Sequence, residues 1–238
     1  HEEALAGYLR VLGDEYADTL LVMSSIGYLY LVQGKFLKAE PFYREVLQTR
    51  RRVLGDEHPD TLTSINNMGV WFLNQDQYDE AEDYFVEALE IRRRIGDSLL
   101  HTSINNMGFL RIKQERYAEA EPYLREALNI RREVLEANDP KLIGSIRNMC
   151  ILFIDQGKYD EALVYLNELE TLGWDDASIL NSIAWEAVEK LDKQFFAKES
   201  DQFLRVAKRA CELSTYEDAL ILDTLAHVHF ARGEHADA

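Results

Sequence analysis

The sequence predicts an all-α chain organised as an α-solenoid, in which helical hairpins stack one on the next. One segment recurs, because Thr63–Gly69 reappears without change 39 residues later at Thr102–Gly108. Small residues recur with an alanine twelve positions further on, in the pairs Gly27 and Ala39, Gly69 and Ala81, Gly108 and Ala120, and Cys150 and Ala162. Only four prolines interrupt 238 residues. Such a period is typical of arrays in which each unit packs on its neighbours rather than on a central core.

Each repeat is expected to hold two helices. In the second repeat we expect the first helix at about 60–73, where Ile65, Met68, Gly69 and Phe72 fall on one helical face. The second helix is expected at about 78–95, and its inner stripe includes Ala81 and several large apolar side chains. Two apolar stripes joined by the short polar turn 74–76 favour an antiparallel hairpin.

The template predicts a single solenoid over residues 1–238. Its parts are the end of a truncated repeat at about 2–12, repeats at 19–54, 60–95, 99–135, 140–172 and 176–213, and a truncated repeat at 217–238. In the fifth repeat we expect extra residues to enlarge the turn around 192–200. Because both ends are expected to stop within a repeat, we also expect the natural protein to continue at both ends.

Composition excludes several classes of function. A formal net charge of −17 argues against nucleic acid or an anionic membrane as a partner, because such binding depends on clustered Lys and Arg. No apolar run approaches the roughly 20 residues of a membrane span. Two cysteines, Cys150 and Cys211, favour a reducing, cytoplasmic location without disulfides. No nucleophile elbow, phosphate loop or metal motif appears, so we expect a protein that is not an enzyme and uses no cofactor or metal.

A family likeness rests on three features. The small residue is followed by an alanine, the alanine is followed four positions further by an aromatic residue or leucine (Tyr43, Phe85, Leu124, Leu166), and the segment Leu54–Asp60 leads into the second repeat. They resemble the tetratricopeptide repeat (TPR), in its kinesin-light-chain-like subtype. The resemblance implies a right-handed superhelix whose first helices line a concave groove for an extended peptide. It therefore implies a protein–protein interaction scaffold with a protein or peptide as its partner.

The resemblance also implies which residues face the groove. The candidate peptide-binding residues are Ser25, Tyr28, Asn67, Asn106, Phe109, Lys113, Arg147 and Asn148. The recurring asparagines are the sharpest signal, because an amide side chain offers a donor and an acceptor to a peptide backbone. The alternative is that these asparagines bond to neighbouring helices within the array. The flanking apolar residues Tyr28, Val70, Phe109, Ile151 and Trp185 are either side-chain pockets or core.

Other residues have structural interpretations. The arginine runs at 50–52, 92–94 and 131–132 are expected to stabilise the negative ends of helix dipoles. His58, beside Pro59, is expected to cap or position its turn, and the two cysteines are expected to act as small hydrophobic residues. Two other functions remain open. They are a structural, self-associating module and a regulatory domain of a larger, possibly enzymatic protein. The partner's identity and the oligomeric state stay undetermined.

Overall fold

The computed structural model describes residues 15–172, 180–181, 183–185, 193–214 and 217–231. Every regular element within these residues is a helix, and none of them forms a strand. The predicted all-α class is therefore confirmed. The expected helix end at 2–12 and the start of the fifth repeat at 176 lie outside the described residues.

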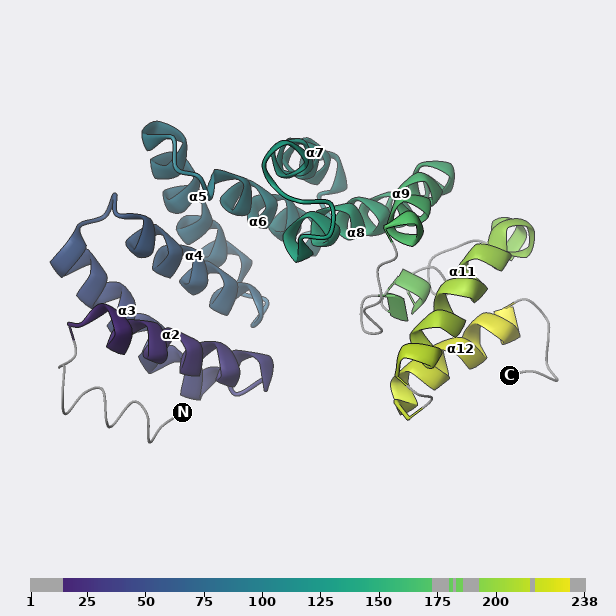
Figure 1. The fold of residues 1–238 in the computed structure, drawn as a ribbon, viewed down its shortest axis with the longest axis horizontal. Coiled ribbons are helices and arrows are strands. Elements are labelled where there is room, and N and C mark those ends of the chain that lie inside the picture. Colours follow the sequence, from purple (N-terminus) through teal and green to yellow (C-terminus); the bar gives the residue numbers. More distant parts are fainter. Residues whose placement is uncertain (1–14, 173–179, 182, 186–192, 215–216, 232–238) are drawn as a thin grey trace. The chain divides into compact units, whose positions relative to one another are not determined.

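The chain divides into two compact units, 1–116 and 117–238. The first contains α2 (Ala17–Val32), α3 (Phe36–Leu54), α4 (Pro59–Leu73), α5 (Tyr78–Ile95) and α6 (Leu100–Lys113). Figure 1 shows α2 with α3 and α4 with α5 as successive antiparallel hairpins. The helices expected at 60–73 and 78–95 are confirmed to within one residue.

The second unit contains α7 (Tyr117–Val134), α8 (Pro140–Asp155), α9 (Tyr159–Thr171), α11 (Lys193–Leu213) and α12 (Ala219–Ala231). The turn expected around 192–200 is wrong for residues 193–200, which form the beginning of α11. These eight residues contain no glycine or proline, and Lys193, Gln194, Ala197 and Glu199 have high helix propensity. The extra residues therefore lengthen a helix.

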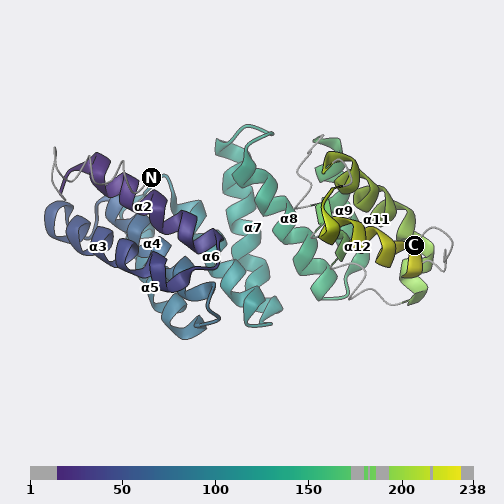
Figure 2. The ribbon, with the colours of Figure 1, turned by 90° about the horizontal axis from the view of Figure 1, so that it is seen from below.

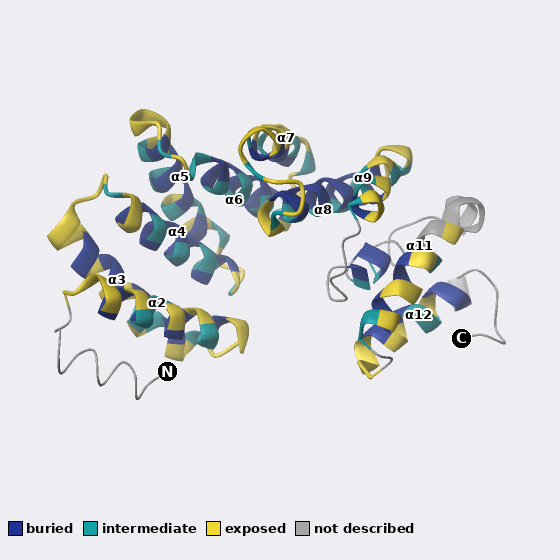
Figure 3. Ribbon diagram, viewed as in Figure 1, coloured by how far each residue is buried: buried dark blue, intermediate teal, exposed yellow. Residues whose placement is uncertain are grey.

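Close helix crossings explain the recurring small residues. A Cβ atom added to Gly69 would lie 2.5 Å from Cε1 of Phe85, so any larger residue would displace that ring. Gly27 approaches the ring of Tyr43 in the same way, at 3.1 Å. The partner alanines Ala39, Ala81, Ala120 and Ala162 are all buried. Figure 3 shows buried residues on the faces where paired helices meet. The recurring small residues are therefore packing positions.

The N-termini of α4 and α8 have matching caps. His58 Nδ1 accepts a hydrogen bond from the backbone N–H of Asp60 at 3.1 Å, which confirms the expected role of His58. Asp139 Oδ1 accepts one from Lys141 N–H at 2.7 Å. In both helices the cap precedes a proline, whose missing N–H would have had no partner in the first turn. A side-chain acceptor and a proline thus fix where these helices begin.

A buried arginine joins each of three second helices to the next first helix. Nη1 of Arg50 donates to Ser64 Oγ at 2.9 Å and to the Asp60 carbonyl at 3.1 Å. Nη1 of Arg92 makes the same pair of bonds to Ser103 and the Leu99 carbonyl, at 2.9 and 3.2 Å. Nη1 of Arg131 repeats them on Ser145 and the Lys141 carbonyl, at 2.5 and 2.9 Å. We call these three contacts the arginine junctions.

The arginine junctions correct the sequence-based interpretation of the arginine runs. One arginine of each run is buried and bonded to the next repeat, a role beyond that of a charge near a helix end. Its exposed neighbours reach other helices instead: Arg51 pairs with Glu87 at 2.5 Å and Arg132 with Glu168 at 2.7 Å. Exposed ion pairs contribute little each, typically below about 1 kcal/mol. The buried arginines are therefore the polar contact that recurs between these repeats.

Candidate functional site

The first helices α2, α4 and α6 form one face of the first unit, here called the first-helix face (Figure 2). A cavity of about 520 Å³ opens between α2 and α4. Its apolar wall consists of Tyr28, Leu29, Leu31, Tyr43 and Val70. Its polar lining consists of Ser24, Ser25 and Asn67. The structure therefore brings three of the predicted site residues, Ser25, Tyr28 and Asn67, to one cavity.

The polar groups of this cavity differ in whether the protein already uses them. Ser25 Oγ donates to the Leu21 carbonyl of its own helix at 2.9 Å. Ser24 Oγ is buried and has no hydrogen-bond partner among the described residues. The Asn67 side chain likewise forms no hydrogen bond to any described residue. The half-buried Asn67 amide is thus available to a ligand, whereas Ser24 Oγ is enclosed and unpaired.

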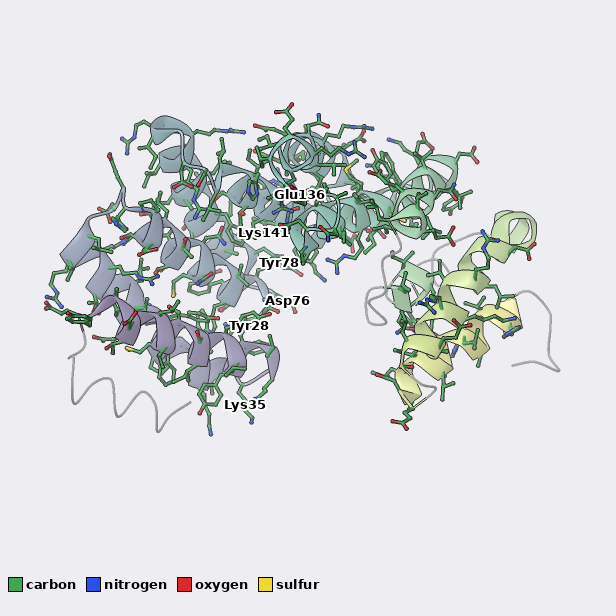
Figure 4. All side chains as sticks on the ribbon, viewed as in Figure 1. Tyr28, Lys35, Asp76, Tyr78, Glu136 and Lys141 are labelled. Atoms are coloured by element: carbon green, nitrogen blue, oxygen red, sulfur yellow. The ribbon has the colours of Figure 1, made fainter. Side chains whose placement is uncertain are left out.

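Two tyrosines frame the cavity. Tyr28, labelled in Figure 4, extends from α2 and is 60% exposed, although it is large and aromatic. Tyr43, on α3, is buried against Gly27, and burial raises the pKa of its phenol to about 12. Tyr43 therefore stays protonated and uncharged at neutral pH. None of the described residues that line this cavity is charged. Such a lining suits an uncharged group that combines apolar contact with hydrogen bonding.

On α6 the predicted residues have different surroundings. Asn106 Nδ2 donates to Oδ1 of the buried Asn66 on α4 at 3.0 Å. This bond is the contact within the array that was weighed as the alternative to peptide binding. Phe109 is half-buried, and the Lys113 ammonium lies 5.6 Å from the centre of its ring. Lys113 is exposed at the C-terminal end of α6.

In the second unit the predicted residues lie on α8. Asn148 is buried, and its Oδ1 accepts hydrogen bonds from Nε and Nη2 of Arg147 at 3.3 and 3.0 Å. Ile151, from the predicted apolar ladder, is half-buried on the same helix. Trp185 contacts the ring of His227 edge-on, with the ring centres 5.3 Å apart. Arg147 and Asn148 are thus already bonded to each other.

A further polar cluster lies between α5 and α6. Arg111 is buried and donates to both carboxylate oxygens of Glu82, at 2.6 and 2.5 Å, and to Gln114 at 2.7 Å. These hydrogen bonds from Arg111 lower the pKa of Glu82. The corresponding positions in three other repeats are the aromatic residues Tyr30, Phe72 and Phe153. This ion pair therefore distinguishes the third repeat from these three.

Sequence reasoning missed the contribution of Tyr43 to the site. Tyr43 lies on α3, a second helix, and the candidate site residues were all chosen from first helices. Gly27 and Tyr43 are nevertheless in close contact. The alternative that an asparagine bonds to a neighbouring helix was considered, and Asn106 with Asn66 is the pair that does so. The signal for this pair is that the position three residues before the small anchor carries serine in the first repeat and asparagine in the second.

The remaining chemical candidates have structural roles. Cys150 and Cys211 are free and buried, and burial raises the pKa of the Cys150 thiol to about 12. No group of three or more His, Cys, Asp or Glu side chains suited to a metal ion occurs in the part of the chain that the structure describes. Among those same residues, no helix is long and apolar enough to span a membrane.

Comparison with known proteins identifies the repeats. The tetratricopeptide-repeat family profile matches residues 18–94 and 99–172. A search of curated proteins found no match. Solved structures resemble the chain, and two of them relate to kinesin light chains. The "putative kinesin light chain nearly identical TPR-like repeats" of Podosopora anserina have a TM-score of 0.55 at 15% identity and cover 92% of this chain and 97% of their own.

BtubC (BKLC) from P. vanneervenii has a TM-score of 0.62 at 16% identity, over 100% of this chain and 88% of its own. A Rap protein in complex with competence and sporulation factor has a TM-score of 0.65 at 16% identity, over 92% of this chain and 65% of its own. At such identities the likeness concerns the fold. The profile match covers well over half of the sequence, and the chain therefore belongs to the tetratricopeptide-repeat family.

Proposed function

We propose that this chain is a non-enzymatic interaction scaffold that binds an extended segment of a partner protein on the first-helix face of its first unit. The observation that carries the proposal is the cavity between α2 and α4, where Asn67 presents an uncommitted amide beside the exposed ring of Tyr28. Such a site combines apolar contact with hydrogen bonds that a peptide can satisfy. The likeness to a Rap protein solved with a bound factor supports the choice of a protein or peptide partner.

The electrostatics of the site predict how binding responds to salt. The cavity has an uncharged lining, although the whole chain has a formal net charge of −17. Binding should therefore depend on hydrogen bonds and apolar contact, and its affinity should change little with ionic strength. The two free, buried cysteines fit the cytoplasmic setting that we propose from the composition.

The test uses peptides selected from a displayed random library on the folded chain. Their affinities are then measured by calorimetry for the wild type, Asn67→Ala and Tyr28→Ala, with Asp83→Ala as a control. Asp83 is exposed on α5, a second helix. Loss of one hydrogen bond should weaken binding about 2- to 10-fold, while the control should leave it unchanged. If the peptides bind the wild type and all three variants equally, the binding surface does not lie on the first-helix face.

Self-association is a second candidate, favoured by exposed leucines on α12. Leu220 is 77% exposed, and Leu222 is exposed as well. If this surface joins two copies, Leu220→Lys should convert a concentration-dependent dimer into a monomer in sedimentation experiments. A wild-type chain that is monomeric at all accessible concentrations would exclude this role. A regulatory role within a larger protein concerns sequence beyond this chain and stays a prediction.

A further inference from the structure

One hydrogen bond links successive first helices within the first unit. Asn106, two residues before Gly108, donates to Asn66, three residues before Gly69. The bond joins α6 to α4 and satisfies an amide that is only 6% exposed. We call this side-chain pair a rung, because the repeat places an equivalent pair of positions between each first helix and the next.

Between α2 and α4 the same two positions are Ser24, three residues before Gly27, and Asn67, two residues before Gly69. Serine lacks the carboxamide that Asn66 supplies in the neighbouring rung. Ser24 Oγ is buried without a partner, and Asn67 has none either, among the residues that the structure describes. Both residues line the cavity of about 520 Å³. The cavity therefore coincides with a rung that lacks one amide group.

The surroundings limit what could complete this rung. A carboxylate or ammonium group would enter a lining without an opposite charge, which is costly. A purely apolar group would cover the Asn67 amide and leave it unpaired, which is also costly, and would leave Ser24 Oγ unpaired as before. A neutral carboxamide supplies a donor and an acceptor together, as Asn66 does for Asn106. Because Ser24 Oγ is buried, the group must be carried on a side chain that inserts between the helices.

We infer that the cavity between α2 and α4 takes the side-chain carboxamide of a glutamine or asparagine from the bound partner segment, which completes the rung between Ser24 and Asn67. This inference rests on the proposed function and names the residue class that the first-helix face selects. The flanking rings of Tyr28 and Tyr43 contact the methylene groups of that side chain.

The test uses the tightest peptide selected from the displayed library, together with versions in which each Gln is replaced by Glu or Leu and each Asn by Asp or Leu. One Gln or Asn should be required, and its replacement by the isosteric Glu (for Gln) or Asp (for Asn) should weaken binding about tenfold or more. On the protein, Ser24→Asn should complete the rung internally and weaken binding of the same peptide about tenfold. Ser24→Ala should weaken it about 2- to 10-fold by removing one hydrogen bond.

Ser98→Asn is the matched control, because Ser98 is exposed in the connection between α5 and α6. It should leave the affinity unchanged. Peptides that depend on Tyr28 and Asn67 but tolerate Leu at every Gln and Asn would overturn this inference and leave the proposed function standing. So would undiminished binding to Ser24→Asn. A selection that returns no peptide sensitive to Asn67→Ala overturns both.

Discussion

The arginine junctions and the first-helix positions are produced by the same repeats, yet they differ in how faithfully they repeat. Arg50, Arg92 and Arg131 each bond to a serine Oγ and to the carbonyl four residues before that serine. The asparagines two residues before the small anchors have three different surroundings. Asn67 is uncommitted, Asn106 bonds to Asn66, and Asn148 accepts from Arg147.

The difference follows from the charge of the buried group. A buried guanidinium is stable only where its donors find acceptors, so few arrangements are acceptable and the same one recurs. A neutral amide can bond to a side chain of its own helix or to a neighbouring repeat and, where it is half-exposed as in Asn67 and Asn106, to water or a ligand. The repeats therefore keep their junctions constant and vary the face that is available for binding.

The largest expected effect tests the junctions. Arg92→Met should lower the free energy of unfolding by about 3–5 kcal/mol, because it leaves the buried Asp97 carboxylate, 3.5 Å from Arg92 Nε, without its cation. Urea denaturation followed by circular dichroism measures the change. Arg93→Met is the control, because Arg93 is exposed, and it should change stability by less than about 0.5 kcal/mol. Equal denaturation midpoints for both variants would mean that the junctions contribute little to the free energy of unfolding.

The second prediction tests close packing within a hairpin. Ala120 is fully buried on α7, so Ala120→Leu should overpack the crossing and cost about 1–3 kcal/mol. The thermal unfolding midpoint measures the loss. Ala118→Leu places the same side chain at an exposed position of α7 and should be nearly neutral. An unchanged midpoint for Ala120→Leu would contradict this packing.

The third prediction separates the asparagines by stability alone. Asn106→Ala should cost about 1 kcal/mol, because it leaves the buried amide of Asn66 without its donor. Asn67→Ala should leave stability unchanged, because the Asn67 side chain bonds to no described residue. Chemical denaturation of the two variants makes the comparison directly. Equal losses of stability in the two variants would show that the two positions are equivalent. They would contradict the inference that the rung between Ser24 and Asn67 lacks an amide group.

The fourth prediction concerns the helix caps that position the first helices. His58→Ala should destabilise the chain by about 0.5–1 kcal/mol, because the Asp60 N–H loses its acceptor. His58→Asp should preserve stability, as Asp139 caps α8 through the same kind of bond. Thermal unfolding at neutral pH distinguishes the variants. A loss in His58→Asp as large as that in His58→Ala would contradict a capping role.

The effect that depends most on acid concerns Glu82. Hydrogen bonds from Arg111 lower the pKa of Glu82 in the folded chain. Its stabilising contribution is therefore present above the unfolded pKa of about 4.3 and is lost as the pH falls through the folded pKa. Glu82→Gln should flatten the acid limb of the stability curve. Glu80→Gln, at an exposed neighbouring position, should leave that limb unchanged.

Particular residues show how much of the site was predictable. The spacing from Gly69 to Ala81 predicts the hairpin, because a close crossing tolerates only small side chains, and Phe85 fills the space that a larger residue at position 69 would need. The candidate positions Ser25, Tyr28 and Asn67 meet at the cavity because repeat offsets fix which helical face they occupy. The contribution of Tyr43 was not predictable from those offsets, since it arises between two helices.

By itself the sequence determined the family, the hairpins and the positions that share a face, because helical periodicity and close packing are local, repeating constraints. The tertiary structure decided which of the equivalent side chains already form hydrogen bonds within the chain. Asn67 and Asn106 occupy equivalent positions within an identical local sequence, and only the residue on the preceding first helix, Ser24 or Asn66, separates an available amide from a bonded one. That distinction depends on the reach of one side chain across two helices, and periodicity does not encode it.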